Sequence, residues 1–175
     1  MKRKLDVLRY LQCVPFFNNF GKKELVEVAN LESNFLTFKK GDLIIKQGDI
    51  DISFFVLIKG RVSVRRKERP NMEIVALEPG QLFGEMSYIL QTNRTTNIVA
   101  KTDRVTVLRL DGDTLESISP VVLGKVKDNF LGLLAQRITQ MDDQLSSLKL
   151  EVEAVIHANN QVAKELSSLI EKISG

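Results

Sequence analysis

The sequence predicts a mainly β domain, a β-roll of the jelly-roll or cupin-like kind, with flanking helices and a long C-terminal coiled-coil helix. Between about residues 34 and 110, short runs rich in Val, Ile, Phe and Thr alternate with charged residues and glycines, which is typical of many short strands. After about residue 114, apolar residues recur in alternating steps of four and three, which is typical of a heptad-repeat helix. We therefore expect three parts: an N-terminal helical segment at 1–31, the β-roll at 32–115 and the long helix at 116–175.

The N-terminal segment is expected to form helices interrupted at Pro15 and Gly21, because both residue types disfavour a helix interior. Its basic start is interpreted as a solvated helix end. Apolar residues on either side of the interruptions recur at helical spacing: Leu5, Leu8, Leu11, Leu25, Val28 and Ala29.

The strand region is divided by glycines, as expected where short strands are joined by tight turns. Gly48 and Gly60 are expected to occupy turns with positive φ, which glycine adopts without a steric penalty. The other dividing glycines are Gly41, Gly80 and Gly84, and the strand-like runs between them are NFLTFKK, DLIIKQ, SFFVLIK, RVSVRRK, EIVALE, TNIVA and RVTVLRL.

The C-terminal heptad repeat predicts a parallel homodimeric coiled coil, because so short a chain has nothing else to cover its apolar stripe. Asn159 is the only polar residue in this stripe, and a lone Asn at an a position favours a parallel, in-register pair. Ile156, Ala163 and Ile170 lie at e positions, where charges are usual, so a higher oligomer or a further partner remains an alternative. The dimer seam consists of Leu134, Ile138, Met141, Leu145, Leu148, Val152, Val155, Asn159, Val162, Leu166, Leu169 and Ile173.

Composition narrows the classes of function. The 175 residues are 43% hydrophobic and 27% charged, consistent with a soluble globular domain plus an extension. The net charge of +3 gives only weak support for nucleic-acid binding. Cys13 is the only cysteine and His157 the only histidine of the sequence. Disulfide frameworks, thiolate zinc sites and histidine metal clusters built from this chain alone are therefore excluded. No apolar run has membrane-spanning length, and Asp6 and Arg9 interrupt any signal-peptide apolar region, so we expect a cytoplasmic protein.

The stretch FGEMSYILQTNRTTNIVA, residues 83–100, places Glu85 and Arg94 close together in a segment otherwise suited to a core. One interpretation is a site for a small anion attached to a sugar, in which Arg94 is a permanently charged donor for the anion and Glu85 accepts from a sugar hydroxyl. Gly84 would leave room for the ligand, EMSYIL would begin a short helix, and Thr95 adds a hydroxyl. The alternative is a buried or half-buried ion pair, which the residue chemistry alone does not exclude.

This stretch resembles the phosphate-binding cassette of the cyclic nucleotide-binding domain family. The resemblance is carried by FGEMS at 83–87, RTTNI at 94–98 and the upstream KKGDLIIKQGD, and it covers roughly residues 14–115. It implies that Arg94 binds the cyclic phosphate and that Glu85 accepts from the ribose 2′-hydroxyl. It further implies backbone contacts from Gly84, Met86, Ser87 and Thr95, a tighter pocket at Thr96, and apolar residues near the base at Val64 and Leu77.

Three positions depart from the family pattern. Asn93 stands where Pro is common, and Asn also suits a turn. Thr96 stands where Ala is usual. Ile52 replaces a common Asp, with Asp51 one position earlier. None of these changes removes a group expected to bind the ligand.

Two further resemblances bear on whether the base of the ligand is adenine or guanine. Residues 133–148, LLAQRITQMDDQLSSL, resemble the dimerisation helix of the bacterial cAMP receptor protein family, in which Met141 would pack near the base without reading it by hydrogen bonds. This favours cAMP over cGMP as the regulatory ligand. A threonine directly after the arginine, as at Thr95, resembles the pattern of cGMP-responsive kinases and channels. The same threonine also occurs in cAMP-responsive channels. No cofactor and no metal are expected.

The resemblance implies a sensor and regulatory protein rather than an enzyme. Its dimeric coiled coil would transmit the signal to a partner protein. One alternative is a structural adaptor with a degenerate nucleotide site. Another is a truncated DNA-binding transcription regulator, although the heptads continue through Ile173, where a helix-turn-helix would otherwise begin. An enzyme on a cupin-like barrel would normally need histidines in the strands, and the strand region has none.

Overall fold

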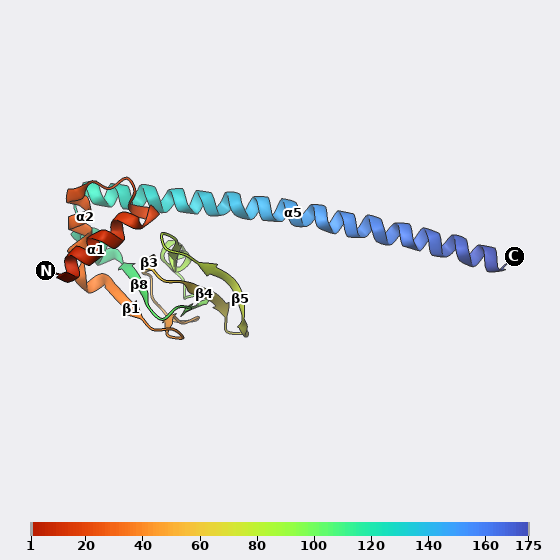
Figure 1. Cartoon of the computed structure of the whole chain (residues 1–175), viewed down its shortest axis with the longest axis horizontal. Coiled ribbons are helices and arrows are strands. Elements are labelled where there is room, and N and C mark those ends of the chain that lie inside the picture. Colours follow the sequence, from red (N-terminus) through yellow and green to blue (C-terminus); the bar gives the residue numbers. More distant parts are fainter. Residues whose placement is uncertain (1, 175) are drawn as a thin grey trace. The chain divides into compact units, whose positions relative to one another are not determined.

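The computed structural model describes the backbone of residues 2–174 and the side chains of residues 7–166. The chain divides into two units, Met1–Leu131 and Gly132–Gly175. The first unit is a β-roll with helices at its N-terminus and after its last strand, and the second is the continuation of a single long helix (Figure 1). The predicted β-roll with flanking helices and a long C-terminal helix is therefore confirmed, whereas the coiled coil stays a prediction.

The N-terminal helices are interrupted where the sequence predicts. The helix α1 (Lys2–Cys13) ends before the short η1 (Pro15–Phe17), and α2 (Lys22–Ala29) starts directly after Gly21. The N–H of Gly21 donates to Glu24 Oε2 at 2.6 Å, which satisfies one of the free N–H groups at the start of α2. A second short turn, η2 (Glu32–Asn34), leads into the first strand.

The β-roll consists of two four-stranded antiparallel sheets, with strand orders β1-β8-β3-β6 and β2-β7-β4-β5. Each strand is short and follows a turn or a loop, as the glycine spacing predicts. The strands are β1 (Phe35–Phe38), β2 (Leu43–Ile45), β3 (Phe54–Lys59), β4 (Val62–Arg66), β5 (Arg69–Leu77), β6 (Leu82–Phe83), β7 (Asn97–Ala100) and β8 (Val105–Leu110).

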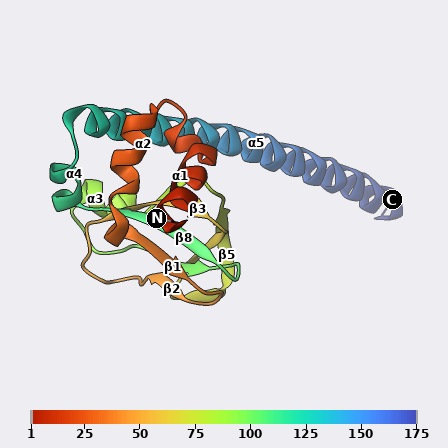
Figure 2. The ribbon, with the colours of Figure 1, turned by 60° about the vertical axis from the view of Figure 1, so that its left-hand side comes forward.

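The main core lies between the two sheets and is built from residues that alternate along the strands. On β3, Phe55 and Leu57 join this core, whereas Phe54 is buried against the helices, so that the strand is covered on both faces. Figure 2 shows α1 beside β3, and the two elements are in contact. The core cluster consists of Ile45, Phe55, Leu57, Val62, Leu77, Phe83, Ile98, Ala100, Val105 and Val107.

The two turn glycines singled out in the sequence both have positive φ, 94° at Gly48 and 83° at Gly60. At Gly60 a side chain would also clash, because a Cβ would lie 2.5 Å from the carbonyl oxygen of Arg104. Glycine is therefore required there for both backbone conformation and space.

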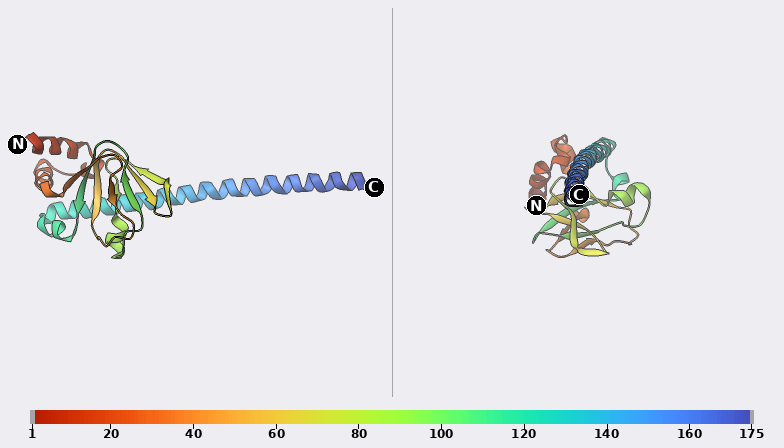
Figure 3. Two further views of the ribbon diagram at one scale, coloured as in Figure 1. Left: turned by 90° about the horizontal axis from the view of Figure 1, so that it is seen from below. Right: turned by 90° about the vertical axis from the view of Figure 1, so that its right-hand side faces the viewer.

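Three helices follow or interrupt the strands: α3 (Glu85–Leu90), α4 (Gly112–Ser117) and α5 (Pro120–Ser174). The region expected as one helix from residue 116 is thus divided between α4 and α5. Proline has no N–H and is tolerated in the first turn of a helix, so Pro120 is a suitable start for α5. Figure 3 shows α5 as one unbroken helix.

The first turns of α5 are tied to the N-terminal helices by polar contacts within the first unit. Lys125 Nζ donates to Glu24 Oε2 at 2.6 Å and to the carbonyl oxygen of Asn19 at 2.7 Å. The Asn129 amide donates to the carbonyl oxygen of Phe16 at 2.6 Å. Val122 and Val126 are buried beside these contacts. The start of α5 therefore belongs to the packed part of the first unit.

The heptad seam is largely exposed in the single chain. Leu134 is half-buried, and the other seam residues are exposed from Ile138 to Leu166. Leu169 and Ile173 lie outside the side chains that the structure describes. None of the helices within residues 2–174 has the length and apolar character needed to cross a membrane.

Candidate functional site

The segment between β6 and β7 forms a loop that brings Gly84 and Arg94 together. Gly84 has a φ of 77° and precedes α3, and a Cβ on it would lie 2.7 Å from Arg94 Nη1 and 3.0 Å from Ile45 Cδ1. EMSYIL forms a helix, as the sequence predicts. Gly84 is therefore needed to let the arginine side chain approach the backbone. The sequence had predicted that this glycine leaves room for a ligand.

The guanidinium of Arg94 is buried, with 3% of the residue exposed. Its Nη1 donates to the carbonyl oxygen of Gly84 at 2.8 Å, and its Nη2 donates to Asp51 Oδ2 at 2.7 Å and to Ser53 Oγ at 3.1 Å. The Nε of Arg94 is buried and has no hydrogen-bond partner in the structure. The protein thus holds both terminal nitrogens of the guanidinium and leaves the Nε–H donor without a partner.

Asp51 compensates the buried charge of Arg94. Burial on its own would raise the pKa of the Asp51 carboxyl, but hydrogen bonds from Arg94 and from the N–H and hydroxyl of Ser53 outweigh it and lower the pKa to about 2. The carboxylate is therefore ionised at neutral pH, and the 2.7 Å contact with Arg94 is a charge-assisted hydrogen bond.

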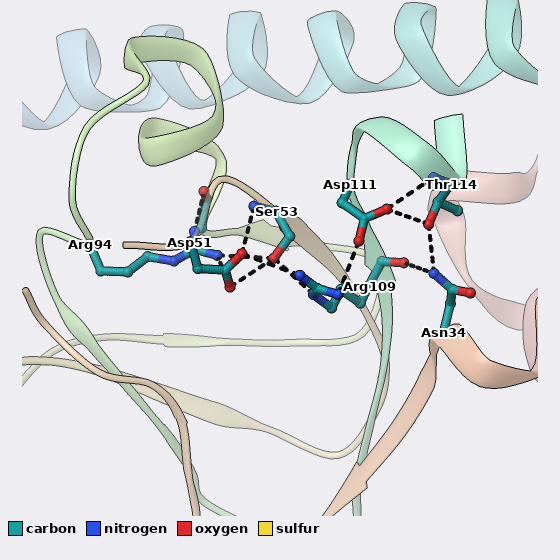
Figure 4. Close-up of polar contacts among 8 residues, drawn as sticks. Asn34, Asp51, Ser53, Arg94, Arg109, Asp111 and Thr114 are labelled. Atoms are coloured by element: carbon teal, nitrogen blue, oxygen red, sulfur yellow. Dashed lines mark hydrogen bonds and ion pairs between the residues drawn. The ribbon is translucent and has the colours of Figure 1, made fainter. Parts of the chain in front are cut away.

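A polar network continues from Asp51 toward the end of β8 (Figure 4). Ser53 Oγ donates to Asp51 Oδ2 at 3.0 Å and accepts from Arg109 Nε at 3.1 Å. Arg109 Nη2 lies 3.4 Å from Asp51 Oδ1, and its Nη1 lies 3.0 Å from Asp111 Oδ2. Asp51 is thus shared between an arginine of the loop before β7 and an arginine of β8.

The far end of this network caps α4. Asp111 Oδ1 accepts from the N–H of Thr114 at 2.9 Å and from its hydroxyl at 2.6 Å. Burial alone would raise the pKa of Asp111, but the hydrogen bonds from Thr114 and the charge of Arg109 lower it. Asn34 Nδ2 donates to Thr114 Oγ1 at 2.7 Å, which links η2 to the start of α4.

The remaining loop residues predicted as ligand contacts lie at different depths. Glu85 and Ser87 are buried, at 6% and 2% exposure, and Ser87 Oγ donates to the carbonyl oxygen of Asn93 at 3.4 Å. Met86 and Thr95 are exposed, and Thr96 is half-buried. All of these residues lie on the one segment between β6 and β7, which contains α3: Gly84, Glu85, Met86, Ser87, Arg94, Thr95 and Thr96.

The residues predicted near the base fall into two groups. Leu77 belongs to the core between the sheets, and Val64 packs against this core from β4. Met141 lies on α5 in the second unit and is exposed.

No role for Asp51, Ser53 or Arg109 follows from the sequence alone. Asp51 was noted only because it stands one position before a common family Asp. The signals that could have identified the others were weak, since a single serine before a strand and an arginine inside a strand have many uses. Their roles follow from contacts between residues far apart in the sequence, 41 residues for Ser53 with Arg94 and 58 residues for Asp51 with Arg109.

An aromatic cluster joins α3 to β3 and to the first part of α5. Tyr88 lies 5.0 Å from Phe54 and 6.2 Å from Phe130, measured between ring centroids, and Phe54 lies 4.8 Å from Phe130. The rings meet edge to face, the favourable geometry for aromatic pairs. The helix that follows Gly84 therefore contacts the start of α5 through Tyr88, within the first unit.

In the described part of the chain, no group of three His, Cys, Asp or Glu residues is arranged to hold a metal ion. The chemistry of the site is that of a buried, permanently charged donor beside the start of a short helix.

Comparison with known proteins identifies the domain. The family model of the cyclic nucleotide-binding domain matches residues 35–119. The chain is 32% identical over 123 residues to cGMP-dependent protein kinase, isozyme 1, of Drosophila melanogaster, and 32% identical over 110 residues to cGMP-dependent protein kinase 2 of Homo sapiens. These matches cover 67% and 60% of this chain but only 16% and 14% of the kinases.

Solved structures share the fold. A cyclic nucleotide-binding domain from Methylobacillus flagellatus superposes with a TM-score of 0.63 at 22% identity, covering 82% of each chain. The catabolite activator protein of Thermus thermophilus gives 0.59 at 26% identity, covering 77% of this chain and 63% of that one. The regulatory domain of Toxoplasma gondii PKA, solved with cAMP, gives 0.57 at 22%, covering 79% and 51%. The resemblance seen in the sequence is confirmed, and through residues 35–119 the chain belongs to the cyclic nucleotide-binding domain family.

Proposed function

We propose that this protein is a cyclic nucleotide sensor that binds its ligand in the β-roll and signals through a parallel coiled-coil dimer of α5 to a partner protein. Membership of the family supports the ligand class, since the matched region is the nucleotide-binding domain of its relatives.

The single observation that carries the proposed site is the unused donor of Arg94. A buried N–H group without a partner costs about 1–3 kcal/mol, because it has left water and gained nothing in return. Arg94 is buried, its other nitrogens are held by Gly84, Asp51 and Ser53, and its Nε has no partner. A phosphate oxygen would supply the missing acceptor through a charge-assisted hydrogen bond.

The rest of the loop suits a sugar phosphate. In the proposed complex, Arg94 contacts the cyclic phosphate, and the Glu85 carboxylate accepts from the ribose 2′-hydroxyl. Backbone groups of Gly84, Met86, Ser87 and Thr95 complete the phosphate contacts, with Thr96 narrowing the loop. Val64 and Leu77 would provide apolar surface on the core side, where both side chains pack.

For the base we propose cAMP, with cGMP as the second candidate. The preference for cAMP rests on the resemblance of residues 133–148 to bacterial cAMP receptor proteins. Two observations favour cGMP. Thr95 is exposed next to Arg94 and could offer its hydroxyl to a guanine, and the curated relatives cited above are named as cGMP-dependent kinases.

The proposed signal runs from the loop to α5 through the aromatic cluster. A ligand shifts a conformational equilibrium only if it binds one arrangement better than another. If phosphate binding moves α3, Tyr88 must move against Phe54 and Phe130, because the three rings are in contact. Phe130 lies in the first turns of α5, so the start of the proposed dimer helix would respond.

The dimer is supported by the exposed seam of α5. Side chains such as Leu145, Leu148 and Val155 are more than half exposed in the single chain, and they recur with heptad spacing. Asn159 in this seam favours a parallel, in-register pair. The partner protein would recognise a change in the geometry of this pair.

Isothermal titration calorimetry of the purified chain with cAMP, cGMP and a cyclic dinucleotide tests the proposal. We expect binding of at least one of the two mononucleotides, and the ratio of their affinities identifies the base. Heat from neither mononucleotide would reject the sensor and support the alternative of a structural adaptor with a degenerate site.

A further inference from the structure

The seam of α5 changes character along the helix. In its first part, Ile138 and Leu145 occupy a positions and Leu148 a d position, a combination compatible with two strands. Arg137 at g and Asp142 at e are five residues apart, the separation at which g and e′ side chains meet across a parallel pair. This part has both the core and the charged flanks of a two-stranded coil.

The second part, from Val152 to Leu166, has a different core, and Glu165 is the one charged residue at its g and e positions. Val155 and Val162 are β-branched residues at d positions, which shifts the preference away from dimers toward higher oligomers. Ile156 occupies an e position and Ala158 a g position, where the first part has charges. The distal seam therefore has no charged pair to border a two-stranded coil.

The apolar surface of this part is also too wide for one partner helix. At about 100° per residue, positions a and d lie about 60° apart, whereas the arc from g through d and a to e spans about 160°. Ile156 is 54% exposed and Val155 59% exposed in the single chain. An apolar face of this width is typical of a helix that packs against two neighbours in a bundle.

We propose that two parallel dimers of this chain associate through Val152–Leu166 into a four-helix coil. The proposal rests on the proposed dimer and adds a second interface, which is continuous with the dimer seam. Each α5 helix carries the same face, with the small Ala158 and Ala163 allowing close approach and Ile156 filling the space between helices.

A second copy of the chain fits this face better than a strongly charged partner. The residues that border the face carry both signs, with Lys149 and Lys164 on one side of the balance and Glu151, Glu153 and Glu165 on the other. Since no single sign dominates, another copy meets no net repulsion. Asn159 would keep the two helices of each dimer parallel and in register, because each amide needs another amide at the same level.

Sedimentation equilibrium of the full chain, from low-micromolar to submillimolar concentrations, tests this proposal. We expect a dimer that converts to a tetramer as concentration rises. The double variant Ile156→Glu, Ala163→Glu should remain a dimer throughout, because burying several carboxylates at one level is unfavourable. The matched control is Leu150→Glu, an f position that is 68% exposed, which should behave like the wild type.

The outcomes separate this proposal from the one on which it rests. A wild-type dimer at every concentration overturns the four-helix coil and leaves the proposed dimer intact, whereas a monomer overturns both. A tetramer that persists in the double variant, or is lost in Leu150→Glu, also overturns the assignment of the face. Circular dichroism of each variant identifies loss of helix, and nucleotide titration shows that the first unit is still folded.

Discussion

Asp51 and Arg94, 43 residues apart in the sequence, form an ion pair in which Oδ2 and Nη2 are 2.7 Å apart. The pair holds a buried guanidinium beside Gly84 with its Nε unpartnered. A permanently charged group is thereby kept in place before any ligand arrives, so that less ordering is required on binding.

Replacing Arg94 with Ala should weaken cyclic nucleotide binding by about a hundredfold or more. Hydrogen bonds to charged groups contribute about 1.5–3 kcal/mol each, and every 1.4 kcal/mol is a factor of about ten in affinity. Calorimetry provides the measurement. The matched control is Arg66→Ala, which removes the same charge from an exposed site on the β4–β5 hairpin and should bind normally. Unchanged affinity in Arg94→Ala would show that the phosphate binds elsewhere.

The ion pair should also make stability depend on pH in the acid range. The pKa of Asp51 is lowered from 3.8 to about 2 in the folded protein. A carboxyl whose pKa is depressed by folding stabilises the folded state above its unfolded pKa, and this contribution is lost as pH falls from about 4 to 2. Denaturant unfolding across this range should show a shallower loss of stability in Asp51→Asn than in the wild type.

Asp51→Asn should also be less stable than the wild type at neutral pH, because Arg94 is left with a buried, unpaired charge. The control Asp103→Asn changes an exposed carboxyl in a loop and should leave both quantities unchanged. An acid-range slope in Asp51→Asn equal to that of the wild type would refute the assignment of this pH dependence to Asp51.

A methyl group at Gly84 should reduce both stability and nucleotide affinity. The φ of 77° is strained for alanine, and its Cβ would lie 2.7 Å from Arg94 Nη1. We expect Gly84→Ala to destabilise the protein by about 1–3 kcal/mol and to weaken binding because the guanidinium must move. Thermal unfolding and calorimetry measure the two effects. Gly112→Ala is the matched control, since a Cβ there meets nothing within 4 Å. Equal behaviour of the two variants would contradict this account.

The contacts of Tyr88 should carry the response of α5 to ligand. Paired spin labels on the α5 helices of a dimer should report different distances with and without nucleotide in the wild type. In Tyr88→Ala this difference should shrink, because α3 then loses its ring contact with Phe130. Ile89→Ala, a neighbouring and 46% exposed position, serves as control. An identical distance change in Tyr88→Ala and the wild type would exclude this path.

The features that the sequence predicted correctly are local in the chain. The positive φ of Gly48 and Gly60, the helix EMSYIL and the long C-terminal helix each depend on residues within one or a few turns. Such features can be read from residue type and spacing because neighbours in sequence are neighbours in space.

The features that the sequence did not predict require distant segments to meet. Neither the sharing of Asp51 between Arg94 and Arg109 nor the contact of Tyr88 with Phe130 has a local signature. Both depend on the antiparallel pairing of β3 with β8 and on the packing of α5 against β3. The sequence can therefore indicate a candidate site at residues 83–100 without indicating the distant residues that hold Arg94 in place.

Asn159 provides the last test, since it should fix the orientation of the dimer at a cost in stability. Replacing it with Leu at the same a position should raise the melting temperature of α5, because a buried amide is exchanged for an apolar side chain.

The variant should also lose specificity for the parallel arrangement. Cysteine cross-linking of the helix ends then provides the measurement, in a background lacking Cys13. The wild type should form parallel cross-links only, whereas Asn159→Leu should form both orientations. Asn160→Leu, at the neighbouring outward b position, is the control and should remain parallel. A fall in melting temperature in Asn159→Leu, with parallel cross-links retained, would mean that Asn159 does not lie in the seam.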